Sequence, residues 1–267
     1  MIITLLSDFG TTDHYVAAMK GAILSRDPRI RIVDVSHEVP SHDIATAGFL
    51  LHSAYRDFPG GTVHLAVVDP GVGSARRPIA IQVGDYSFVG PDNGIFDLIR
   101  SHEAGEARLI DSPELRRAAP SRTFHGRDIF APTAAALAAG FPFDRVGPVV
   151  ELGKPLYSDE PPDASGTIQG RILHVDHFGN AVTSLTAADL TGGPVAYRFA
   201  GSDWTVDEVR DFYSAGKGIG PFVIEGSSGY FEISVNRGSA AALLSLRRGD
   251  YVDAIPRSRA DARQAGD

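Results

Sequence analysis

Val67-Val68-Asp69-Pro70-Gly71-Val72-Gly73-Ser74-Ala75-Arg76 is the stretch of this sequence that says most about the fold. An apolar run over residues 62–68 predicts a buried strand, which ends on the carboxylate of Asp69. A Pro-Gly-Val-Gly turn follows, and the chain then reaches Arg76. In open α/β sheets, ligands bind outside the carboxyl ends of the strands. An acid at that position, with an arginine returning toward it, therefore indicates chemistry more than packing.

Size and composition narrow the class of protein. The chain has 267 residues, enough for one large domain or for two smaller ones. Its hydrophobic fraction of 43% is typical of a globular protein, and the net charge of −8 argues against an extended surface for nucleic acid. No apolar stretch approaches the roughly 20 residues that cross a bilayer. The first residues carry no basic segment, so we expect no signal peptide and no membrane partner.

The sequence contains no cysteine. This excludes disulfides, thiolate catalysis and metal sites with cysteine ligands. The expectation is therefore a cytoplasmic enzyme or small-molecule-binding protein that has no nucleic-acid partner.

Strand and helix patterns alternate over residues 1–150. Strands are predicted at residues 2–6, 30–35, 63–68, 79–83 and 86–89. Helices are predicted between and after them, at about 12–24, 43–55, 93–99 and 128–139. Thr12 or Asp13 is the expected cap of the first helix, and Asp128 is a plausible cap of the last. Such alternation predicts an α/β domain with a mainly parallel sheet between helices.

The second half of the chain has a different pattern. Residues 151–166 are rich in proline, serine and acidic residues and predict a linker. Strand patterns fill residues 167–256, at 170–175, 181–185, 195–199, 221–225, 230–235 and 251–255. They predict a smaller all-β domain, either a barrel or a sandwich. Residues 257–267 are polar, and we expect a disordered tail.

A nucleotide-binding loop of the common kinds is poorly supported. Gly71 and Gly73 suggest a dinucleotide-binding turn, but Arg76 replaces the third glycine of that fingerprint. The sequence also contains no P-loop motif. Neither fingerprint therefore explains the stretch after Asp69.

Metal binding has two weak candidates. His37 and His42 flank a proline that spoils a helical His-Glu-x-x-His motif. His174 and His177 lie three positions apart in a strand pattern and would point to opposite faces. We therefore expect no metal site.

Asp8 follows the first predicted strand. In the simplest interpretation, residues 7–13 form a strand–turn–helix junction in which Asp13 caps the helix. Alternatively, Asp8 accepts hydrogen bonds from paired hydroxyl groups such as a ribose diol, because an ionised carboxylate only accepts. The local sequence supports the two interpretations equally.

His125 lies in the sequence Thr123-Phe124-His125-Gly126-Arg127-Asp128, before the alanine-rich helix. As a helix cap, Asp128 accounts for part of this motif. His125 is next to a glycine in a loop, where core packing explains it poorly, and catalytic groups often lie on such loops. We therefore favour a functional role for His125.

Three turns of the second domain carry polar or aromatic side chains. Asp176-His177-Phe178-Gly179-Asn180 could form a plain β-turn, but Phe178 could also stack on a planar base. Ser227-Ser228-Gly229-Tyr230 and Asn236-Arg237-Gly238-Ser239 flank another strand. Each could again be a plain turn, although Asn236 has the amide needed to read an adenine edge.

Together and in this order, these motifs resemble the S-adenosyl-L-methionine (SAM) hydroxide adenosyltransferase family, which is related to fluorinating and chlorinating SAM enzymes. The matching segments are residues 7–13, 67–76, 124–128, 176–180 and 227–238. The resemblance implies an N-terminal α/β domain, a C-terminal β-barrel and a homotrimer with SAM at subunit interfaces. It also implies hydrolysis of SAM to adenosine and L-methionine, with SAM as the substrate and no cofactor.

The same resemblance assigns site residues. The catalytic aspartate, arginine and histidine of the family fall on Asp69, Arg76 and His125. The substrate-binding residues that it implies are Asp8, Asp13, His42, Phe124, Asp176, Phe178, Asn180, Tyr213, Ser227, Ser228, Asn236 and Arg237.

Individual roles also follow from the resemblance. Asp8 matches the ribose-binding acid, and Asp176 matches a position that holds the methionine amine. Phe178 and Tyr213 match aromatic positions around the adenine. The side chain of Asn236 and the backbone of Arg237 match contacts to the adenine edge. Ser227 and Ser228 match the neighbourhood of the SAM carboxylate, where halogenating relatives have an arginine at the position of Ser228.

Halogenating relatives carry tyrosine at the positions of Asp69 and His125. An acidic Asp69 would repel a halide, whereas aspartate and histidine both hydrogen-bond water. The sequence therefore favours water as the nucleophile and leaves open whether Asp69 or His125 takes its proton. The alternatives are a SAM-dependent halogenase, and a non-catalytic SAM- or adenosine-binding protein that would not need the Asp69–Arg76–His125 set.

Overall fold

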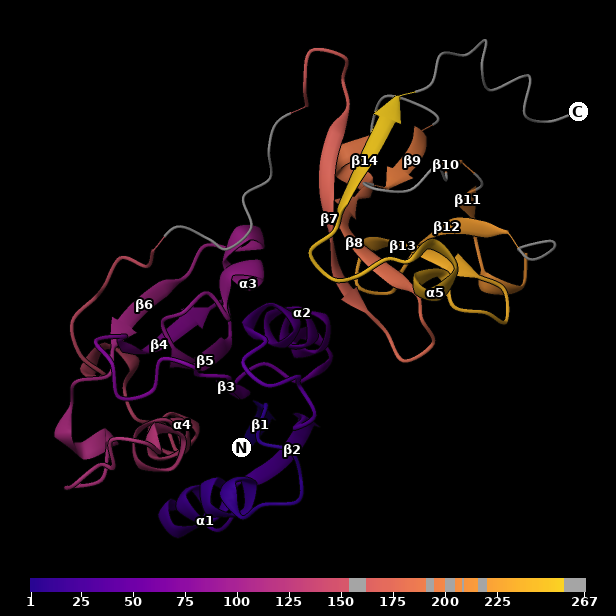
Figure 1. The fold of residues 1–267 in the computed structure, drawn as a ribbon. Coiled ribbons are helices and arrows are strands. Elements are labelled where there is room, and N and C mark those ends of the chain that lie inside the picture. The colour runs from indigo at the N-terminus through magenta and orange to yellow at the C-terminus, as the bar shows by residue number, and fades with distance from the viewer. Residues whose placement is uncertain (154–161, 191–194, 200–204, 208, 216–219, 257–267) are drawn as a thin grey trace, which may run out of the picture. The chain divides into compact units, whose positions relative to one another are not determined.

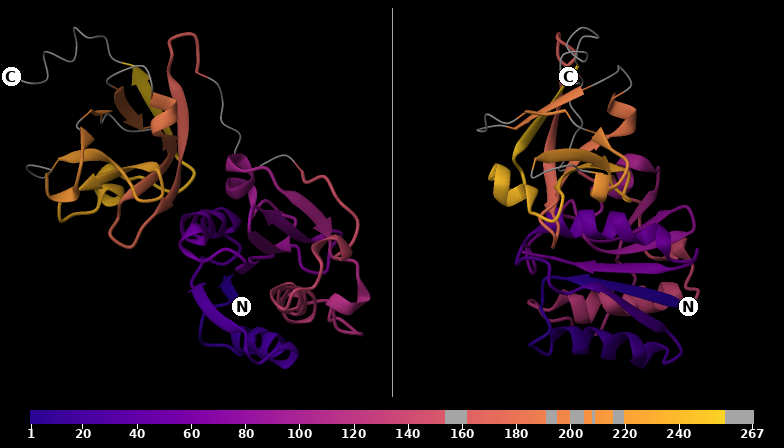
Figure 2. Two further views of the ribbon diagram at one scale, coloured as in Figure 1. Left: turned by 180° about the vertical axis from the view of Figure 1, so that it is seen from behind. Right: turned by 90° about the vertical axis from the view of Figure 1, so that its right-hand side faces the viewer.

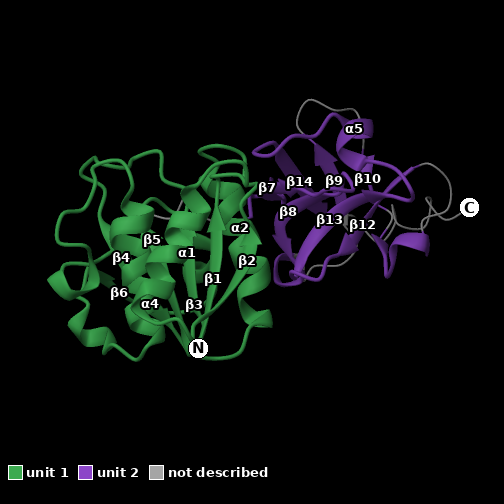
Figure 3. Cartoon of the chain, turned by 90° about the horizontal axis from the view of Figure 1, so that it is seen from below, with its two compact units in different colours: residues 1–157 green, residues 158–267 purple. Residues whose placement is uncertain are grey.

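The computed structural model describes residues 1–153, 162–190, 195–199, 205–207, 209–215 and 220–256. The chain divides into two compact units, residues 1–157 and 158–267 (Figure 3). The expected linker at 151–166 falls partly outside the described residues, and the expected tail at 257–267 falls wholly outside them. The expected boundaries of 1–150 and 167–256 therefore stay predictions, whereas an architecture of an N-terminal and a C-terminal part, each with a sheet, is confirmed.

The first unit contains a six-stranded sheet in the order β2-β1-β3-β5-β4-β6 (Figure 1). β1 pairs in parallel with β2 and β3, and β3 pairs in parallel with β5. In contrast, β4 is antiparallel to both β5 and β6. The strands are Ile2–Ser7 (β1), Arg31–Ser36 (β2), Val63–Val67 (β3), Pro78–Val83 (β4), Tyr86–Pro91 (β5) and Glu106–Leu109 (β6).

This sheet is mixed, so the expected parallel arrangement holds only for β2, β1, β3 and β5. Only Gly84 and Asp85 join β4 to β5. A parallel connection needs a crossover of a dozen or more residues, so this two-residue turn requires an antiparallel hairpin. β6 lies outside the predicted strands because its four residues show no clear alternation.

Helices cover both faces of the sheet, as the right-hand view of Figure 2 shows edge-on. α1 and α4 pack on one face, in a core that includes Met19 and Phe130. α2 and α3 pack on the other face, in a core that includes Leu51 and Ile99. The helices are Tyr15–Arg26 (α1), Ile44–Ala54 (α2), Asp97–His102 (α3) and Ala131–Ala138 (α4).

The start of α1 differs from the expectation. This helix begins after His14, which makes no side-chain cap hydrogen bond, so neither Thr12 nor Asp13 caps it. The start of α2 has a regular cap, because the backbone N–H of Thr46 donates to the Asp43 carboxylate at 2.9 Å.

The region before α4 also differs from the expectation. Residues Gly126–Phe130 form a single π-helical turn, and α4 continues from it. Asp128 is buried inside this turn instead of capping the helix. The short third helix, α3, begins at Asp97 and not at Asn93.

The connectivity of the sheet brings polar residues to one edge. The chain passes from β1 to β2 on one side of β1 and then to β3 on the other side, so a topological switch point lies between β1 and β3. Ser7 in β1 is in register with Val67 in β3. Asp8 and Asp69 therefore follow the carboxyl ends of adjacent parallel strands, where ligands bind in open α/β sheets.

The second unit is built on an eight-stranded sheet in the order β10-β9-β14-β7-β8-β13-β12-β11. β11 and β12 pair in parallel, and the other pairings are antiparallel. The sheet curls, because β10 at one edge lies close to β12. The strands are Ile168–Val175 (β7), Ala181–Thr186 (β8), Val195–Phe199 (β9), Thr205–Val206 (β10), Val209–Arg210 (β11), Pro221–Glu225 (β12), Tyr230–Val235 (β13) and Tyr251–Pro256 (β14).

A closed all-β barrel describes this unit only in part. Among the described residues, no strand pairing joins β10 to β11, so barrel closure stays a prediction. The unit also contains a short helix, Ala240–Leu244 (α5), whose first turn donates to the hydroxyl of Ser239 at 3.0 Å. This helix and the two-residue strands β10 and β11 lie outside the predicted elements.

Short 3-10 turns complete the described structure of both units, at Tyr55–Asp57, Pro113–Leu115, Phe143–Arg145, Ala187–Leu190 and Tyr213–Ala215. Within the described ranges, no helix has the length and apolar character that crossing a membrane requires.

Candidate active site

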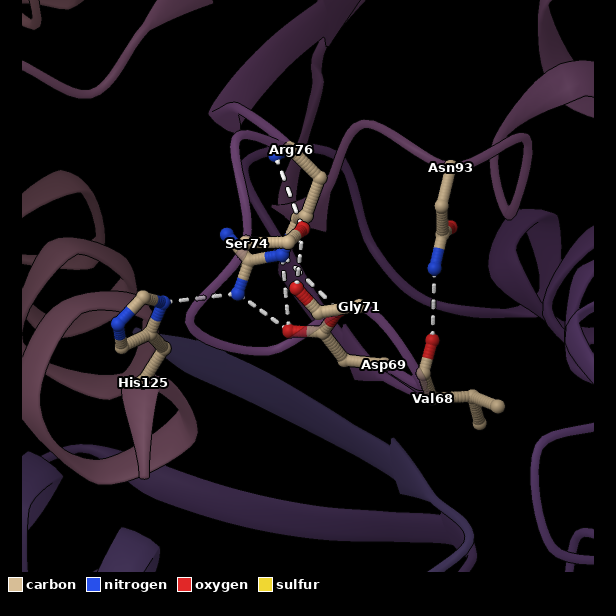
Figure 4. A network of polar contacts seen from close by, with 7 residues as sticks. All are labelled: Val68, Asp69, Gly71, Ser74, Arg76, Asn93 and His125. Atoms are coloured by element: carbon tan, nitrogen blue, oxygen red, sulfur yellow. Dashed lines mark hydrogen bonds and ion pairs between the residues drawn. The ribbon is translucent and has the colours of Figure 1, made fainter. Parts of the chain in front are cut away.

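The first unit holds a buried ion pair directly after β3. Arg76 Nε donates to both carboxylate oxygens of Asp69 at 2.9 Å, and Arg76 Nη2 also pairs with Asp69 Oδ2 (Figure 4). The side chains of Arg76 and Asp69 are only 9% and 5% exposed. Little water screens this pair, so each charge depends on the other. The structure thus joins the two residues that the sequence only suggested were close.

His125 is in contact with the same arginine. Arg76 Nη2 lies 2.9 Å from His125 Nδ1 (Figure 4). A guanidinium group only donates, so Nδ1 accepts, and the imidazole is neutral with its proton on Nε2. The pKa of His125 is lowered, first by burial and then by the charge of Arg76, whereas Asp69 and Asp128 act in the opposite direction. The contact with Arg76 and the lowered pKa therefore both indicate that His125 is neutral at neutral pH.

The aromatic ring of Phe130 supports Arg76 from a further side. The guanidinium carbon lies 5.0 Å from the centre of this buried ring, within range of a cation–π interaction. His125 immediately precedes the π-helical turn and Phe130 ends it. Arg76 Nη1 is buried and has no hydrogen-bond partner within the described part of the chain. One donor of the site thus stays available for an oxygen atom.

The turn between Asp69 and Arg76 is held by its own residues. Ser74 Oγ donates to the carbonyl of Gly71 at 2.6 Å and accepts from the backbone N–H of Arg76 at 3.2 Å. Gly73 has a φ of +78°, and a Cβ atom there would lie 2.6 Å from the carbonyl oxygen of Arg122. Both the backbone angle and the close contact require glycine at this position.

Asp8 and His42 come together at the end of β1. The backbone N–H of His42 donates to Asp8 Oδ2 at 2.9 Å, and the imidazole Nδ1 of His42 lies 3.9 Å from the same oxygen. The Asp8 side chain is 9% exposed, whereas that of His42 is 72% exposed. The backbone of His42 therefore fixes the orientation of one carboxylate oxygen of Asp8. A carboxylate that binds a ligand has to be oriented in this way.

The other two candidates of the first unit have different surroundings. Phe124 is buried and makes edge-on contacts with the rings of Phe9 and Tyr15, at centroid distances of 6.0 and 5.3 Å. Its position is thus explained by packing. Asp13 is exposed and makes no hydrogen bond or ion pair within the described part of the chain.

The second unit contains a pocket of about 490 Å³. Five of the predicted substrate-binding residues line it, and the 74% exposed ring of Phe178 is one of them. The lining residues are Asp176, Phe178, Asn180, Tyr213, Val235, Arg237 and Gly238. An aromatic ring, a carboxylate and a carboxamide in one hollow suit a planar polar molecule.

Asp176 organises the turn below this pocket. It accepts hydrogen bonds from the backbone N–H groups of Phe178 and Asn180 at 2.9 and 2.8 Å, and from the side chain of Asn180 at 2.8 Å. These contacts are those of an Asx turn, so Asp176 has a structural role whatever else it binds.

Ser227, Ser228 and Asn236 are not among the residues that line the pocket. Ser227 is exposed and Ser228 is half-buried, and both lie in the turn between β12 and β13. Asn236 is half-buried and directly follows β13.

Backbone strain falls on two of the predicted residues. Among the described residues, the non-glycine positions with positive φ are His42, Arg237 and Ser245, and Ser245 is the C-cap of α5. His42 and Arg237 have φ values of +68° and +56°. Residues held in this sparsely populated region concentrate at binding sites, which supports a functional interpretation of both.

The sequence interpretation missed three side chains that the structure connects to these sites. Phe130 lies below Arg76, and Asn93 donates to the carbonyl oxygen of Val68, directly before Asp69. In the second unit, the Tyr213 hydroxyl donates to Glu232 at 2.7 Å, and burial raises the pKa of that carboxyl, with Asp176 acting in the same direction. None of the three stands in a local motif, so no sequence signal distinguishes them.

Two of the four histidines considered as metal ligands have other partners. His37 Nδ1 lies 2.7 Å from the hydroxyl of Ser7, and its Nε2 lies 3.1 Å from Asp34. His42 lies against Asp8. Within the described ranges, no three histidine or acidic side chains form a group that could hold a metal ion.

These features define a class of protein. It has an α/β unit with an acid–arginine–histidine set at the switch point of its sheet, and a β-rich unit with an aromatic pocket. Family models agree with this description: the SAM hydroxide adenosyltransferase N-terminal domain matches residues 3–147, and its C-terminal domain matches residues 170–253. The chain belongs to the SAM hydroxide adenosyltransferase family, which confirms the resemblance seen in the sequence.

Individual relatives cover nearly the whole chain. A protein of Thermus thermophilus named (R)-S-adenosyl-L-methionine hydrolase is 40% identical over 92% of this chain and 96% of its own length. A fluorinase of an Actinoplanes species is 30% identical over 93% of this chain and 95% of its own length. The crystal structure of an uncharacterized conserved protein from Thermotoga maritima is 34% identical, with a TM-score of 0.87 over 96% of this chain and all of that one.

Proposed function

We propose that this protein hydrolyses SAM to adenosine and L-methionine. The observation that carries the proposal is the contact set of Asp69, Arg76 and His125. The family resemblance implies tyrosine at the positions of Asp69 and His125 in halogenating relatives, which favours water as the nucleophile here. The SAM hydrolases among its relatives support the same reaction, since they match the chain over nearly its full length.

Hydrolysis of SAM requires a positioned nucleophile. The sulfonium of SAM is already a good leaving group, so the departing sulfur needs no acid. Water is a weak nucleophile and has to approach the primary C5′ carbon in line with the C5′–S bond. Holding the reactants in such a near-attack geometry supplies several kcal/mol of the barrier. The task of the site is therefore to hold and orient one water molecule.

The three side chains offer complementary hydrogen bonds to that water. Arg76 only donates, and its Nη1 is unpaired among the described residues. His125 also donates, through Nε2, while its Nδ1 accepts from Arg76. Asp69 only accepts, so it is the member of the set that can take a proton.

The proposed step balances as follows. The oxygen–C5′ bond forms as the C5′–S bond breaks, and the electron pair of that bond goes to the sulfur of methionine. The proton passes from the attacking oxygen to Asp69. A carboxylate is a weak base, but an oxygen bonded to C5′ that still carries both protons is a strong acid. A weak base therefore suffices.

Substrate-binding roles are proposed for residues of each unit separately. Asp8, which His42 orients, is proposed to accept from the ribose hydroxyls. The pocket of the second unit is proposed to hold the adenine against Phe178 and Tyr213. Asp176 is proposed to meet the methionine amine.

The test is a product assay. Purified protein incubated with SAM in ¹⁸O-labelled water should release methionine and adenosine that carries the label at the 5′ oxygen, as read by HPLC and mass spectrometry. Formation of 5′-halo-adenosine in chloride or fluoride, without adenosine, would establish the halogenase alternative. Binding of SAM without any product would establish the non-catalytic alternative.

Two substitutions test the assigned roles. Asp69→Ala and His125→Ala should each lower the turnover of bound SAM by about 10²-fold or more, because they remove a positioned proton acceptor or donor. The affinity for SAM, measured by calorimetry, should change much less. Strong loss of affinity with unchanged turnover of the bound fraction would restrict both residues to substrate binding.

No metal or cofactor is proposed for the reaction, since water attack on a sulfonium needs neither a Lewis acid nor an electron carrier. Activity in excess EDTA should therefore equal activity without it. Loss of activity in EDTA that added metal restores would contradict this proposal.

We also propose that the protein is a cytoplasmic homotrimer with active sites at subunit interfaces. The support for the trimer is the membership of the family. Light scattering of the purified protein should give three times the chain mass of 28.4 kDa. A monomeric mass with full activity would contradict the interfacial site.

A further inference from the structure

The loop from Asp69 to Arg76, here called the catalytic loop, is attached at both ends to one turn after β5. We propose that two residues of this turn, Asp92 and Asn93, are positioning residues that hold Asp69 and Arg76 in their reactive arrangement. The inference rests on the proposed function for the reaction that it affects, but the attachment itself is a structural property that is tested separately.

Asn93 holds the first end of the catalytic loop. Its Nδ2 donates to the carbonyl oxygen of Val68 at 2.9 Å (Figure 4). Its Oδ1 accepts from the backbone N–H of Ile95 at 3.3 Å. The orientation of the amide follows from its partners, because a carbonyl only accepts and an N–H only donates. The Val68 carbonyl belongs to the peptide that leads into Asp69, and Val68 is fully buried. This bond therefore sets where the Asp69 backbone leaves β3.

Asp92 holds the other end. Its backbone N–H donates to the carbonyl of Arg77 at 2.9 Å, and its carboxylate accepts from Arg77 Nε at 2.8 Å. Arg77 directly follows Arg76, so these contacts fix where the catalytic loop enters β4. Two consecutive residues thus hold the peptide before Asp69 and the residue after Arg76.

The order of the strands explains why a single turn reaches both ends. β5 lies between β3, from which the catalytic loop leaves, and β4, into which it returns. The strands are also closely packed there, because a Cβ atom on Gly90 in β5 would clash with the carbonyl oxygen of Ala66 in β3. The carboxyl end of β5 therefore lies beside both ends of the catalytic loop.

The effect of the turn on the reaction is indirect. Among the described contacts, neither Asp92 nor Asn93 touches Asp69, Arg76 or His125 through its side chain. Their influence passes through the backbone of the catalytic loop. A displacement of about 1 Å at a reacting group can lower a rate by about 10²-fold, so losing one attachment should affect turnover more than binding.

The test compares Asn93→Ala with a matched control, Tyr86→Phe. Tyr86 begins β5 at its opposite end, and its hydroxyl also donates to a backbone carbonyl, that of Phe58, at 2.9 Å. Tyr86→Phe removes one side-chain hydrogen bond to a backbone carbonyl, and Asn93→Ala removes one such bond together with the longer bond from the Ile95 N–H. Similar decreases in the thermal midpoint are expected for both.

The two variants should differ in catalysis. Asn93→Ala should lower kcat for SAM hydrolysis by about 10- to 100-fold with little change in KM, and Tyr86→Phe should leave both constants unchanged. The acid limb of the pH–rate profile should also move to higher pH in Asn93→Ala only, because a displaced Arg76 no longer lowers the pKa of His125. Equal kcat values for the two variants would overturn the inference.

Hydrogen exchange separates this inference from the proposed function. Backbone amides of residues 69–77 should exchange faster in Asn93→Ala than in wild type or Tyr86→Phe, and this measurement needs no substrate. Unchanged exchange would overturn the inference whether or not the wild type hydrolyses SAM. Faster exchange in a protein that does not hydrolyse SAM would instead refute the proposed function and leave the attachment established.

Discussion

His125 is the member of the catalytic set whose charge state can change near neutral pH. Its Nδ1 accepts from Arg76, an arrangement that requires the unprotonated form. Protonation would place a second positive charge against Arg76 in a partly buried site. Burial and the arginine charge both lower the pKa of His125. The chemistry that we propose thus depends on a neutral imidazole.

This dependence predicts a pH profile. Because the pKa of His125 in the folded protein lies below the usual value of 6.5, kcat should be constant around pH 7. It should fall only as the pH decreases through the lowered pKa. Measurement of kcat between pH 4.5 and 8.5 tests this. An acid limb with a midpoint above pH 6.5 would contradict this explanation. It would mean that protonation of His125 does not cause the loss of activity, or that Arg76 does not contact His125 in solution.

At the scale of an element, the π-helical turn Gly126–Phe130 determines which side chains contact Arg76. In a regular α-helix, residues five positions apart point about 140° away from each other. The wider turn, closed by the bond from the Ala131 N–H to the Gly126 carbonyl, reduces this angle. His125 and Phe130 can then both contact Arg76. Such turns are frequent at functional sites, and here the turn brings two side chains to one arginine.

The variant Phe130→Leu tests this arrangement. It keeps an apolar side chain but removes the ring beneath Arg76, and cation–π interactions contribute about 0.5–2 kcal/mol. Turnover of SAM should decrease by roughly 2- to 30-fold, since 1.4 kcal/mol corresponds to a factor of ten. The matched control is Phe143→Leu, which removes a ring 5.9 Å from the guanidinium of Arg108. Equal turnover in the two variants would deny Phe130 a role beyond packing.

At the scale of the whole molecule, buried histidines link stability to pH. His64 is fully buried in β3 and contacts the Thr4 hydroxyl of β1 at 2.8 Å. Burial lowers the pKa of His64 to about 4. The pKa of His52 is also lowered to about 4, mainly by burial. In the unfolded chain both groups return to about 6.5.

The sign of the effect follows from these values. Below pH 6.5 the unfolded chain binds protons that the folded protein does not, so the free energy of unfolding should decrease as the pH falls from 6.5 to 4. Each histidine accounts for about 3 kcal/mol at the end of this range. Urea unfolding at several pH values measures the change. His64→Gln should have a shallower pH dependence, and an unchanged slope in this variant would assign the effect to other groups.

Much of the fold was predictable because burial leaves a clear pattern. The long strands of both units are mostly apolar runs, and their predicted and observed ends differ by at most two residues. The elements without a prediction, β6, β10, β11 and α5, have two to five residues, too few for a period to show. The antiparallel turn of β4 onto β5 follows from the two-residue connection at Gly84, and not from hydrophobicity.

The site was predictable to a smaller extent. Asp69 and Arg76 stand together in the sequence at a strand end, which is a local signal. His125 lies 49 positions beyond Arg76, and only the resemblance to a family placed it in the same site. Asn93 acts on a carbonyl 25 positions away, which an asparagine in a turn does not reveal. Contacts of this kind are set by the strand order, which the sequence alone does not specify.

The buried pairing of Asp69 with Arg76 also bears on how new activities can arise in this family. Replacing Asp69 alone by the tyrosine of halogenating relatives would leave Arg76 as an uncompensated buried cation, at a cost of roughly 3–5 kcal/mol. That is a large part of the about 5–15 kcal/mol that keeps a typical protein folded. An evolutionary path from water to halide as the nucleophile therefore passes through coupled substitutions, in which the surroundings of Arg76 change before or together with Asp69.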